Sequence, residues 1–319
     1  MQPQPGHVWI GGRIAAADAA HLSVFDRGFQ LGDGVFETLR ARGGRLTEID
    51  EHIARLRRSA AGLGIPLPAG IRELVERGIG ELLAAEGLDG PESDASVRIT
   101  VSRGSFHGRG LLPPDELVDA TIAIQAWPVL PPPPGHLERG LRVVSSSIRR
   151  DPQNPLSELK TTSRADYVYA RLEARRAGAD DAIFLTVDGL LSEATTANVF
   201  LVRPGSGDRQ ELATPGLDCA ILPGTTRSWL LGWAGRVGLD AVEDRLTARD
   251  LAAADEAFLS SSVAGVLPVT SFDGRPIGDG LPGPWTRLAR ADREAYIAGD
   301  DGSRAARSSL VGGGPDRRP

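Results

Sequence analysis

The chain has 319 residues, of which 41% are hydrophobic and 24% charged, a composition typical of a globular protein with one large domain or two smaller ones. Its formal net charge of −6 argues against a nucleic-acid binder, and its one cysteine, Cys219, rules out an internal disulfide and a cysteine-based metal site. No run of about 18 apolar residues is present and the first residues lack a secretory pattern, so we expect a cytoplasmic protein with no membrane partner.

The first half of the chain predicts a small domain, residues 1–127, built from hairpins and two helices. Asp50 is expected to be the N-cap of the first helix, because Glu51 and a helical spacing of apolar residues follow it. A glycine-rich loop over 102–114 separates the last two strands and is of the kind that carries function. The expected strands are 7–14, as a hairpin turning at Gly11-Gly12, 34–42 paired with 45–49, 97–103 and 119–127; the expected helices are 50–63 and about 69–86.

Four consecutive prolines mark residues 128–140 as a semi-rigid linker, because proline does not fit inside a helix or a central strand. A larger domain, 141–298, is predicted beyond it, and the polar, glycine-rich residues 299–319 are expected to form a disordered tail. The expected strands of the larger domain are 141–148, 182–187 paired with 190–193, 198–202 and 256–260; its expected helices are about 164–177, one that follows Pro223, and 284–297.

Strands and helices are mixed in both halves without steady alternation, which favours an α+β fold over a doubly wound sheet. The chain has no G-x-G-x-x-G motif between a strand and a helix, and it has no P-loop. Sites for a nicotinamide cofactor or a nucleoside triphosphate therefore lack their usual support.

Lys160 is the only lysine of the chain, because 35 of its 36 basic residues are arginines. Arginine serves wherever a positive charge is needed, but its guanidinium stays protonated and cannot attack a carbonyl. An amine kept in such a chain points to covalent chemistry, as in a Schiff base. The alternative is a stray surface lysine, and the other motifs must decide between the two.

Two motifs that follow the lysine fit one cofactor. Glu193, in LSEATTANVF, is a carboxylate among small residues, and if buried it needs a cationic or protonated partner. The turn LPGTTR places the hydroxyls of Thr225 and Thr226 at a helix start, where backbone N–H groups attract anions, although a plain capped helix is the alternative there. An amine, a carboxylate and an anion site together predict a pocket for pyridoxal 5′-phosphate, whose ring nitrogen must be held protonated.

The chain resembles the fold-type IV pyridoxal phosphate enzymes, the family of branched-chain aminotransferases, D-amino-acid aminotransferases and aminodeoxychorismate lyases. The resemblance runs from about Val8 to Ile297. It is carried by FDRGFQLGDGVFETLR, EHIARLRRSA, SEATTANVF, ILPGTTR and FLSSSVAGVLPVTSFDG, which occur in the order of the family. It implies a small N-terminal domain, a larger domain with a pseudo-barrel of strands, and a homodimer in which a partner loop completes each site.

The resemblance also implies roles for single residues. Lys160 would form the Schiff base and carry a proton between the substrate Cα and the cofactor C4′, while Glu193 would hold the pyridine nitrogen. Arg55 would bind the phosphate, for which the alternative is a solvated helix face. Further phosphate contacts are expected from Thr225, Thr226 and Ser262, and substrate contacts from Phe36, Thr38, Arg109, Ser261 and Val263.

The subgroup of the family is left open by these residues. Phe36 stands where D-amino-acid aminotransferases have a tyrosine, and Arg109 does not form their Arg-x-His pair. Thr38 and the glycine-rich loop resemble the lyases, but Ser163 replaces their usual asparagine, and Ala165 replaces the tyrosine of branched-chain enzymes. Arg109 could still bind a substrate carboxylate from the partner subunit, or be a solvated loop arginine.

We therefore predict an aminotransferase that uses a D-amino acid or a branched-chain-like amino acid, with 2-oxoglutarate or pyruvate as acceptor and ping-pong kinetics. The alternative is an aminodeoxychorismate lyase, which releases pyruvate and 4-aminobenzoate and needs no acceptor. A cofactor-binding protein without turnover, or an unrelated structural protein, is the remote alternative; both Lys160 and Glu193 are intact.

Overall fold

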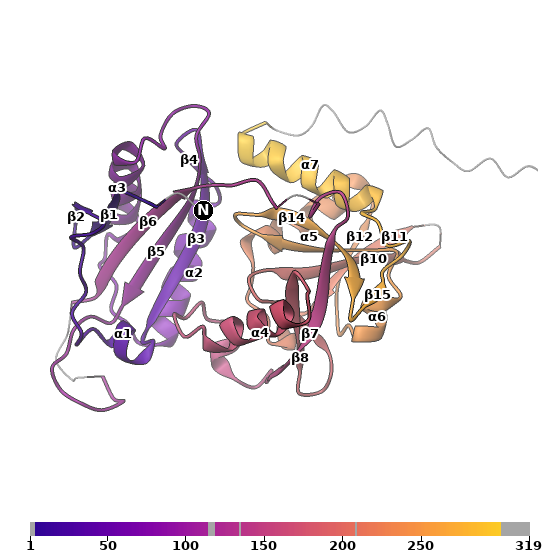
Figure 1. Ribbon diagram of the computed structural model, residues 1–319, viewed down its shortest axis with the longest axis horizontal. Helices are drawn as coiled ribbons and strands as arrows, with labels where there is room; N and C mark the ends of the chain where they lie inside the picture. Colours follow the sequence, from indigo (N-terminus) through magenta and orange to yellow (C-terminus); the bar gives the residue numbers. More distant parts are fainter. Residues whose placement is uncertain (1–3, 114–118, 134, 208, 301–319) are drawn as a thin grey trace, which may run out of the picture.

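Two β-sheets with helices on their faces organise the chain (Figure 1). The computed structural model describes residues 4–113, 119–133, 135–207 and 209–300, so most of the expected tail lies outside the described residues. Among these residues one sheet has six strands, in the order β2-β1-β6-β5-β3-β4. The other has nine, in the order β12-β11-β10-β13-β14-β7-β8-β9, with β15 paired to β14. The fold is α+β with two domains, as predicted.

The six-stranded sheet is antiparallel throughout, and its core lies under two amphipathic helices. On β5, alternate residues from Ala95 to Val101 are buried in that core, so Ser96 and Arg98 lie on the opposite face. The elements of this domain are β1 (His7–Ile10), β2 (Arg13–Ala16), α1 (Arg27–Leu31), β3 (Gly34–Arg42), β4 (Arg45–Leu46), α2 (Ile49–Gly62), α3 (Ile71–Ala85), β5 (Asp94–Ser102) and β6 (Thr121–Pro128).

The nine-stranded sheet is mixed: β14 with β7, β7 with β8 and β11 with β12 are parallel pairs, and its other pairs are antiparallel. Its strands are β7 (Leu141–Arg150), β8 (Asp181–Thr186), β9 (Leu191–Ala194), β10 (Asn198–Pro204), β11 (Gln210–Pro215), β12 (Asp240–Asp244), β13 (Glu256–Ser261), β14 (Gly265–Phe272) and β15 (Arg275–Pro276). Its helices are α4 (Ala165–Arg176), α5 (Thr225–Val237), α6 (Ala248–Ala252) and α7 (Pro284–Ala298), with 3-10 turns η1 (Pro155–Glu158) and η2 (Leu217–Cys219).

The two domains meet where the start of β3 pairs with the segment that carries the lysine. The Phe36 amide donates to the Lys160 carbonyl at 2.9 Å, and the Thr162 amide donates to the Gly34 carbonyl at 2.9 Å. A Cβ at Gly34 would lie 2.9 Å from the Val101 carbonyl oxygen, so a larger residue does not fit at this crossing. The lysine segment is therefore fixed to the small domain by backbone hydrogen bonds, although it belongs to the larger one.

The structure corrects the expected start of the helix after β4. Glu48, and not Asp50, is the N-cap residue of α2, and the expected strand over 45–49 ends at Leu46. Glu48 has a left-handed backbone with φ of 54° and makes no side-chain cap hydrogen bond. Its carboxylate instead pairs with Arg293 of α7, a contact between distant segments that the local pattern does not contain.

Six elements were not predicted from the sequence: α1, β11, β12, α6, β14 and β15. The described residues between β6 and β7 lie in no strand or helix, as expected for the proline-rich segment. Across the described residues, no helix combines the length and the apolar character needed to cross a membrane.

Candidate active site

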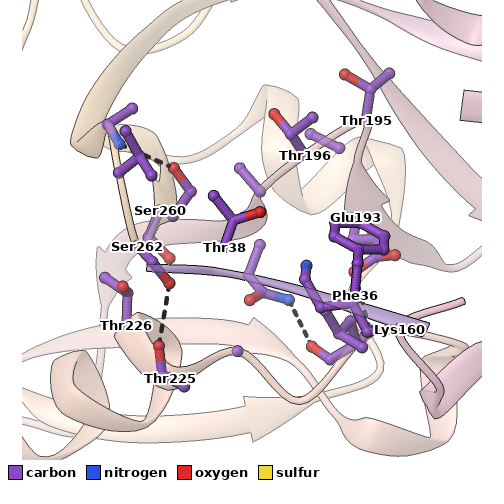
Figure 2. A pocket seen from close by; sticks show the side chains of 18 of the residues that line it. Phe36, Thr38, Lys160, Glu193, Thr195, Thr196, Thr225, Thr226, Ser260 and Ser262 are labelled. Carbon is purple, nitrogen blue, oxygen red and sulfur yellow. Dashed lines mark hydrogen bonds between the residues drawn. The ribbon is translucent and has the colours of Figure 1, made fainter. Parts of the chain in front are cut away.

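A cavity of about 450 Å³ opens at the junction of the two domains, around Lys160. It is lined by Phe36, Thr38, Arg55, Ser96, Arg98, Lys160, Arg164, Glu193, Ala194, Thr195, Thr196, Ala197, Asn198, Leu222, Gly224, Thr225, Thr226, Ser260, Ser261, Ser262, Val263 and Ala264. All predicted site residues except Arg109 are in this lining, although they span more than 200 positions of the sequence. Figure 2 shows Lys160, Phe36 and Glu193 at one end and Thr225, Thr226 and Ser262 at the other.

Lys160 is half-buried in the segment between η1 and α4, where its backbone N–H donates to the Ser59 Oγ at 3.0 Å. Its Nζ lies 4.6 Å from the ring centroid of Phe36. Burial and the positive charge of Arg55 lower the pKa of the Lys160 amine to about 8. An amine with that pKa is partly neutral at physiological pH, as a nucleophile or a general base must be.

Glu193 lies near the end of β9 and is buried, with both carboxylate oxygens held from behind. The Tyr167 hydroxyl donates to Oε1 at 3.1 Å, and the Leu222 amide donates to Oε2 at 2.9 Å. The guanidinium of Arg150 lies 3.7 Å from Oε1. These contacts fix the carboxylate at the cavity wall, where it can accept a hydrogen bond from a protonated ring nitrogen.

Arg55 is held in one orientation by a buried carboxylate. Its Nε and Nη2 each donate to Glu37 at 2.7 Å, and its Nη1 donates to the Pro223 carbonyl at 2.8 Å. His52 Nδ1 also lies 2.7 Å from Glu37, so the carboxylate has three partners. Because a guanidinium has five N–H groups, one N–H on each of Nη1 and Nη2 is not used by Glu37 or Pro223 and can bind an anion, although Nη2 also lies 3.5 Å from the His52 Nδ1.

The first turn of α5 supplies further donors. Gly224 is its N-cap and has no side chain to satisfy the first amides, so these N–H groups stay available to an anion. A Cβ at Gly224 would lie 2.1 Å from the Asn198 Oδ1, which explains the glycine. The Thr225 and Ser262 hydroxyls lie 3.2 Å apart, and the buried Ser260 Oγ has no hydrogen-bond partner among the described residues.

Two cationic residues of the cavity, Arg98 and Arg164, were not predicted from the sequence. The Arg98 and Arg164 guanidinium carbons lie 3.9 Å and 5.7 Å from the ring centroid of Phe36. Within the described residues neither side chain pairs with a carboxylate, and burial followed by the charge of Arg164 lowers the pKa of Arg98. The alternation of apolar and polar residues along β5 indicates that Arg98 faces away from the apolar core, and this pattern could have identified it. Arg164 directly precedes α4 and carried no motif of its own.

Arg109 does not line the cavity of its own chain. It lies in the glycine-rich loop between β5 and β6, and its sequence predicts either a ligand of the substrate carboxylate in the partner subunit's site or a solvated loop arginine. Both alternatives stay predictions.

The donors and acceptors of the cavity fit pyridoxal 5′-phosphate. A reactive amine and a fixed carboxylate lie at one end, while helix amides, hydroxyls and two free guanidinium N–H groups lie at the other. The buried hydroxyl of Ser260 has no hydrogen-bond partner among the described residues, as is common for a group that binds a polar ligand. The amine, the carboxylate and the anion cradle match the aldehyde, the ring nitrogen and the phosphate of this cofactor in turn.

The chain is similar in sequence to known aminotransferases. The family described as amino-transferase class IV matches residues 34–272. The chain is 35% identical over 281 residues to a putative branched-chain-amino-acid aminotransferase of Methanocaldococcus jannaschii, covering 88% of this chain and 92% of the relative. It is 32% identical over 285 residues to a D-alanine aminotransferase of Bacillus licheniformis, covering 88% of this chain and 93% of the relative.

Solved structures agree with these relatives. The branched-chain amino acid aminotransferase of Escherichia coli matches with a TM-score of 0.85 and 27% identity, covering 93% of this chain and 96% of that one. A branched-chain amino acid aminotransferase of T.th., solved with pyridoxamine 5′-phosphate, matches with a TM-score of 0.84 and 27% identity, covering 94% and 96%. These relatives are aminotransferases, which does not favour the lyase alternative. The chain belongs to the class IV aminotransferases.

Proposed function

We propose that the chain is a pyridoxal-5′-phosphate-dependent transaminase that moves an amino group from an amino acid to a 2-oxo acid. The observation that carries this proposal is the placement of the only lysine in a cavity between a buried carboxylate and an anion cradle. The T.th. relative solved with pyridoxamine 5′-phosphate supports the cofactor.

In this proposal each end of the cavity holds one part of the cofactor. Lys160 bonds it covalently, and Glu193 accepts a hydrogen bond from its ring nitrogen. Its phosphate is bound by the free N–H groups of Arg55, by the first turn of α5 and by the Thr225, Thr226 and Ser262 hydroxyls. When bound, pyridoxal 5′-phosphate supplies an electron sink that stabilises negative charge at the substrate Cα.

Lys160 is proposed to be the proton carrier of the reaction. Its pKa of about 8 lets the free amine take a proton from the substrate Cα near neutral pH. The Phe36 ring beside Nζ is a wall that confines the amine to one side of the cavity. The same amine would return the proton at the cofactor C4′ or, in the second half-reaction, at the substrate Cα. The kinetics should be ping-pong, because the first oxo acid leaves before the second one binds.

The substrate end of the cavity is proposed to bind carboxylates. Arg98 and Arg164 flank Phe36 and have no carboxylate partner in the described part of the chain, so their charges are available to an amino acid or oxo acid. Thr38 and the backbone around Ser261 and Val263 complete this end. We propose D-amino acids or branched-chain-like amino acids as donors and 2-oxoglutarate or pyruvate as acceptor.

We also propose that the enzyme is a homodimer. Ser163 and Thr162 donate to the Gly32 carbonyl, which places the end of α1 beside the start of α4. Large apolar side chains are exposed on both helices, with Phe29 at 73% and Val168 at 59% exposure. We name this surface the α1/α4 patch; its members are Phe29, Leu31, Val168, Tyr169 and Leu172. We propose that a second copy of the chain covers this patch, because its burial removes apolar area from water on both chains.

The cytoplasmic location and the role of residues 128–140 as a linker between the domains stay predictions.

The reaction is tested with a half-reaction on the purified protein. Single D- and L-amino acids are added without any oxo acid while the absorbance of the bound cofactor is recorded. We expect loss of the band near the visible edge with a subset of amino acids, and return of the band when 2-oxoglutarate or pyruvate is added. The responding amino acids give the chirality and the substrate class.

Two outcomes contradict the proposal. A protein that shows no such band after addition of pyridoxal 5′-phosphate, or the same band in Lys160→Ala, excludes the proposed site. A protein that has the band, responds to no amino acid and releases pyruvate from aminodeoxychorismate is the lyase.

The dimer is tested by complementation. Lys160→Ala and Arg109→Ala chains are inactive or weak alone, and a mixture that exchanges subunits should regain about a quarter of the wild-type activity, because half of its dimers carry one intact site. Absence of any gain, with exchange verified by mass, removes Arg109 from the partner site.

A further inference from the structure

Arg293 of α7 is fully buried and reaches the proposed phosphate site from behind. Its Nη1 and Nη2 donate to the Glu48 carboxylate at 2.6 Å and 3.1 Å, and Nη2 also donates to the Thr226 Oγ1 at 3.1 Å. Its guanidinium carbon lies 5.1 Å from the Trp229 ring centroid and 5.2 Å from that of Tyr296. Both terminal nitrogens of the guanidinium are therefore held, whereas its buried Nε has no hydrogen-bond partner among the described residues.

Glu48 forms this ion pair from an unfavourable backbone conformation. Its side chain is 5% exposed, and although burial raises the pKa of its carboxyl, the hydrogen bonds and charge of Arg293 outweigh burial and lower it. Its φ of 54° is a left-handed conformation that is unfavourable for residues with a Cβ. Strain of this kind persists only where the surroundings impose it.

The Thr226 hydroxyl receives a hydrogen bond, and no acceptor for its own proton lies among the described residues. Within the described residues, Thr226 Oγ1 makes one hydrogen bond, which it accepts from Arg293 Nη2. This bond uses one lone pair of the oxygen and leaves the hydroxyl hydrogen without an acceptor. Thr226 lies in the first turn of α5 and lines the cavity. Its O–H can therefore donate to an anion bound in the cavity.

A second arginine, Arg55, also donates a hydrogen bond to the turn that precedes α5. Arg55, fixed by the buried Glu37, donates to the Pro223 carbonyl, and Arg293, fixed by Glu48, donates to Thr226. Both glutamates belong to the small domain, and the turn belongs to the larger one. Each arginine thus connects the small domain to the residues that begin α5.

We propose that Arg293, held by Glu48, is a positioning residue that directs the Thr226 hydroxyl at the cofactor phosphate. Arg293 does not touch the anion itself; it acts through Thr226. The proposal rests on the proposed function, because it needs a phosphate in this cavity. It assigns the C-terminal helix α7 a part in cofactor binding, across 67 positions of sequence from Thr226.

The test is a double-mutant cycle on full-length protein freed of cofactor and titrated with inorganic phosphate. The pair Glu48→Gln/Arg293→Met removes both charges together, so that no buried charge is left alone. We expect the pair to weaken phosphate binding about tenfold and Thr226→Val to weaken it to a similar extent. The combined variant should be no weaker than Thr226→Val alone, because both changes remove one interaction.

Matched controls separate positioning from a structural role. Arg287→Met changes an exposed arginine of the same helix as Arg293 and should leave phosphate binding unchanged. Thr226→Ser keeps the hydroxyl and should lose less phosphate affinity than Thr226→Val does. If the Met variant does not fold, Glu48→Gln/Arg293→Gln replaces the ion pair with two amides that can bond to each other, and the same cycle is measured.

The outcomes distinguish the two proposals. If the pair lowers the melting temperature but leaves phosphate affinity unchanged, or if its loss multiplies with that of Thr226→Val, Arg293 is a structural contact and the inference is overturned. If the wild-type protein binds neither inorganic phosphate nor pyridoxal 5′-phosphate, the proposed function itself fails.

Discussion

Phe36 and Lys160 are joined twice, once through the backbone and once through their side chains. The Phe36 amide donates to the Lys160 carbonyl at 2.9 Å, and the Lys160 Nζ lies 4.6 Å from the Phe36 ring centroid. β3 therefore sets the position of the lysine segment, and the ring that β3 presents sets the direction of the amine. The wall of the cavity and its reactive group are therefore connected directly.

The amine of Lys160 should titrate near pH 8 in the protein freed of cofactor. Below that pH it is protonated and unreactive, and above it the neutral amine reacts, so roughly a tenth is neutral at pH 7. Acylation of the one lysine peptide, followed by mass spectrometry against pH, gives the midpoint without interference from other lysines. Arg55→Met should move the midpoint upward, because the Arg55 charge lowers this pKa. A wild-type midpoint near the ordinary lysine value of 10.5 contradicts the prediction.

Glu37→Gln should destabilise the fold at neutral pH by about 3–5 kcal/mol, because it leaves the buried Arg55 without its carboxylate. Burial raises the pKa of Glu37, but the hydrogen bonds and charges of Arg55 and His52 outweigh it and lower the pKa to about 2. The stabilisation is thus complete above the ordinary pKa of 4.5 and is lost as the pH falls toward 2. Urea unfolding between pH 7 and pH 2 should show this loss in the wild type and a smaller one in the variant. If the free energy of unfolding falls with pH by the same amount in the wild type and in Glu37→Gln, Glu37 is not the cause of the acid destabilisation.

Arg98→Met should lower kcat/KM for substrates with two carboxylates by about ten- to a hundredfold, the range expected for a lost charged hydrogen bond. Substrates with one carboxylate should lose less, since Arg164 remains in the cavity. The measurement compares 2-oxoglutarate with pyruvate as acceptors in the same variant. Arg58→Met, an exposed change on α2, is the control. An equal loss with both acceptors would show that Arg98 has no role in choosing between them.

Gly224→Ala should weaken binding of pyridoxal 5′-phosphate, because the new Cβ would lie 2.1 Å from the Asn198 Oδ1 and force one of the two aside. The strain of such overpacking is about 1–3 kcal/mol, or roughly five- to 150-fold in affinity. Asn198→Ala should restore part of the loss, since it removes the clashing atom. Fluorescence titration of the four proteins measures this rescue. If Asn198→Ala worsens the effect of Gly224→Ala, the clash is not its cause.

Local patterns predicted most of the fold. The hairpin at Gly11-Gly12 and the helices α3, α4 and α7 were predicted within a few residues, because spacing and turn residues define them. Asp50 shows the limit of such patterns: it has the composition of an N-cap, but the cap is Glu48, whose conformation is set by Arg293 far along the chain. β14 contains Pro268, and β15 has two residues, so neither gives a strand signal.

Site residues could be predicted from the sequence where the residue type or its setting in the chain is unusual. Lys160 stood out because it is the only amine on a side chain, and Thr225 because it opens a helix after a glycine. Arg98 and Arg164 were lost among 35 arginines. Alternation on β5 shows that Arg98 faces away from its own core, but only the packing of the second domain shows that this face borders the cavity.

The backbone pairing between β3 and the lysine segment has a consequence for biosynthesis. Gly34 and Ser59, which anchor the lysine segment, leave the ribosome before Lys160, whereas Glu193 and the start of α5 leave after it. Burial is the main cause of the lowered Lys160 pKa, and the later segments supply much of the cavity wall. A chain that lacks these later segments is therefore expected to carry a solvated, protonated lysine, and under the proposed function it should bind the cofactor only after the start of α5 has folded.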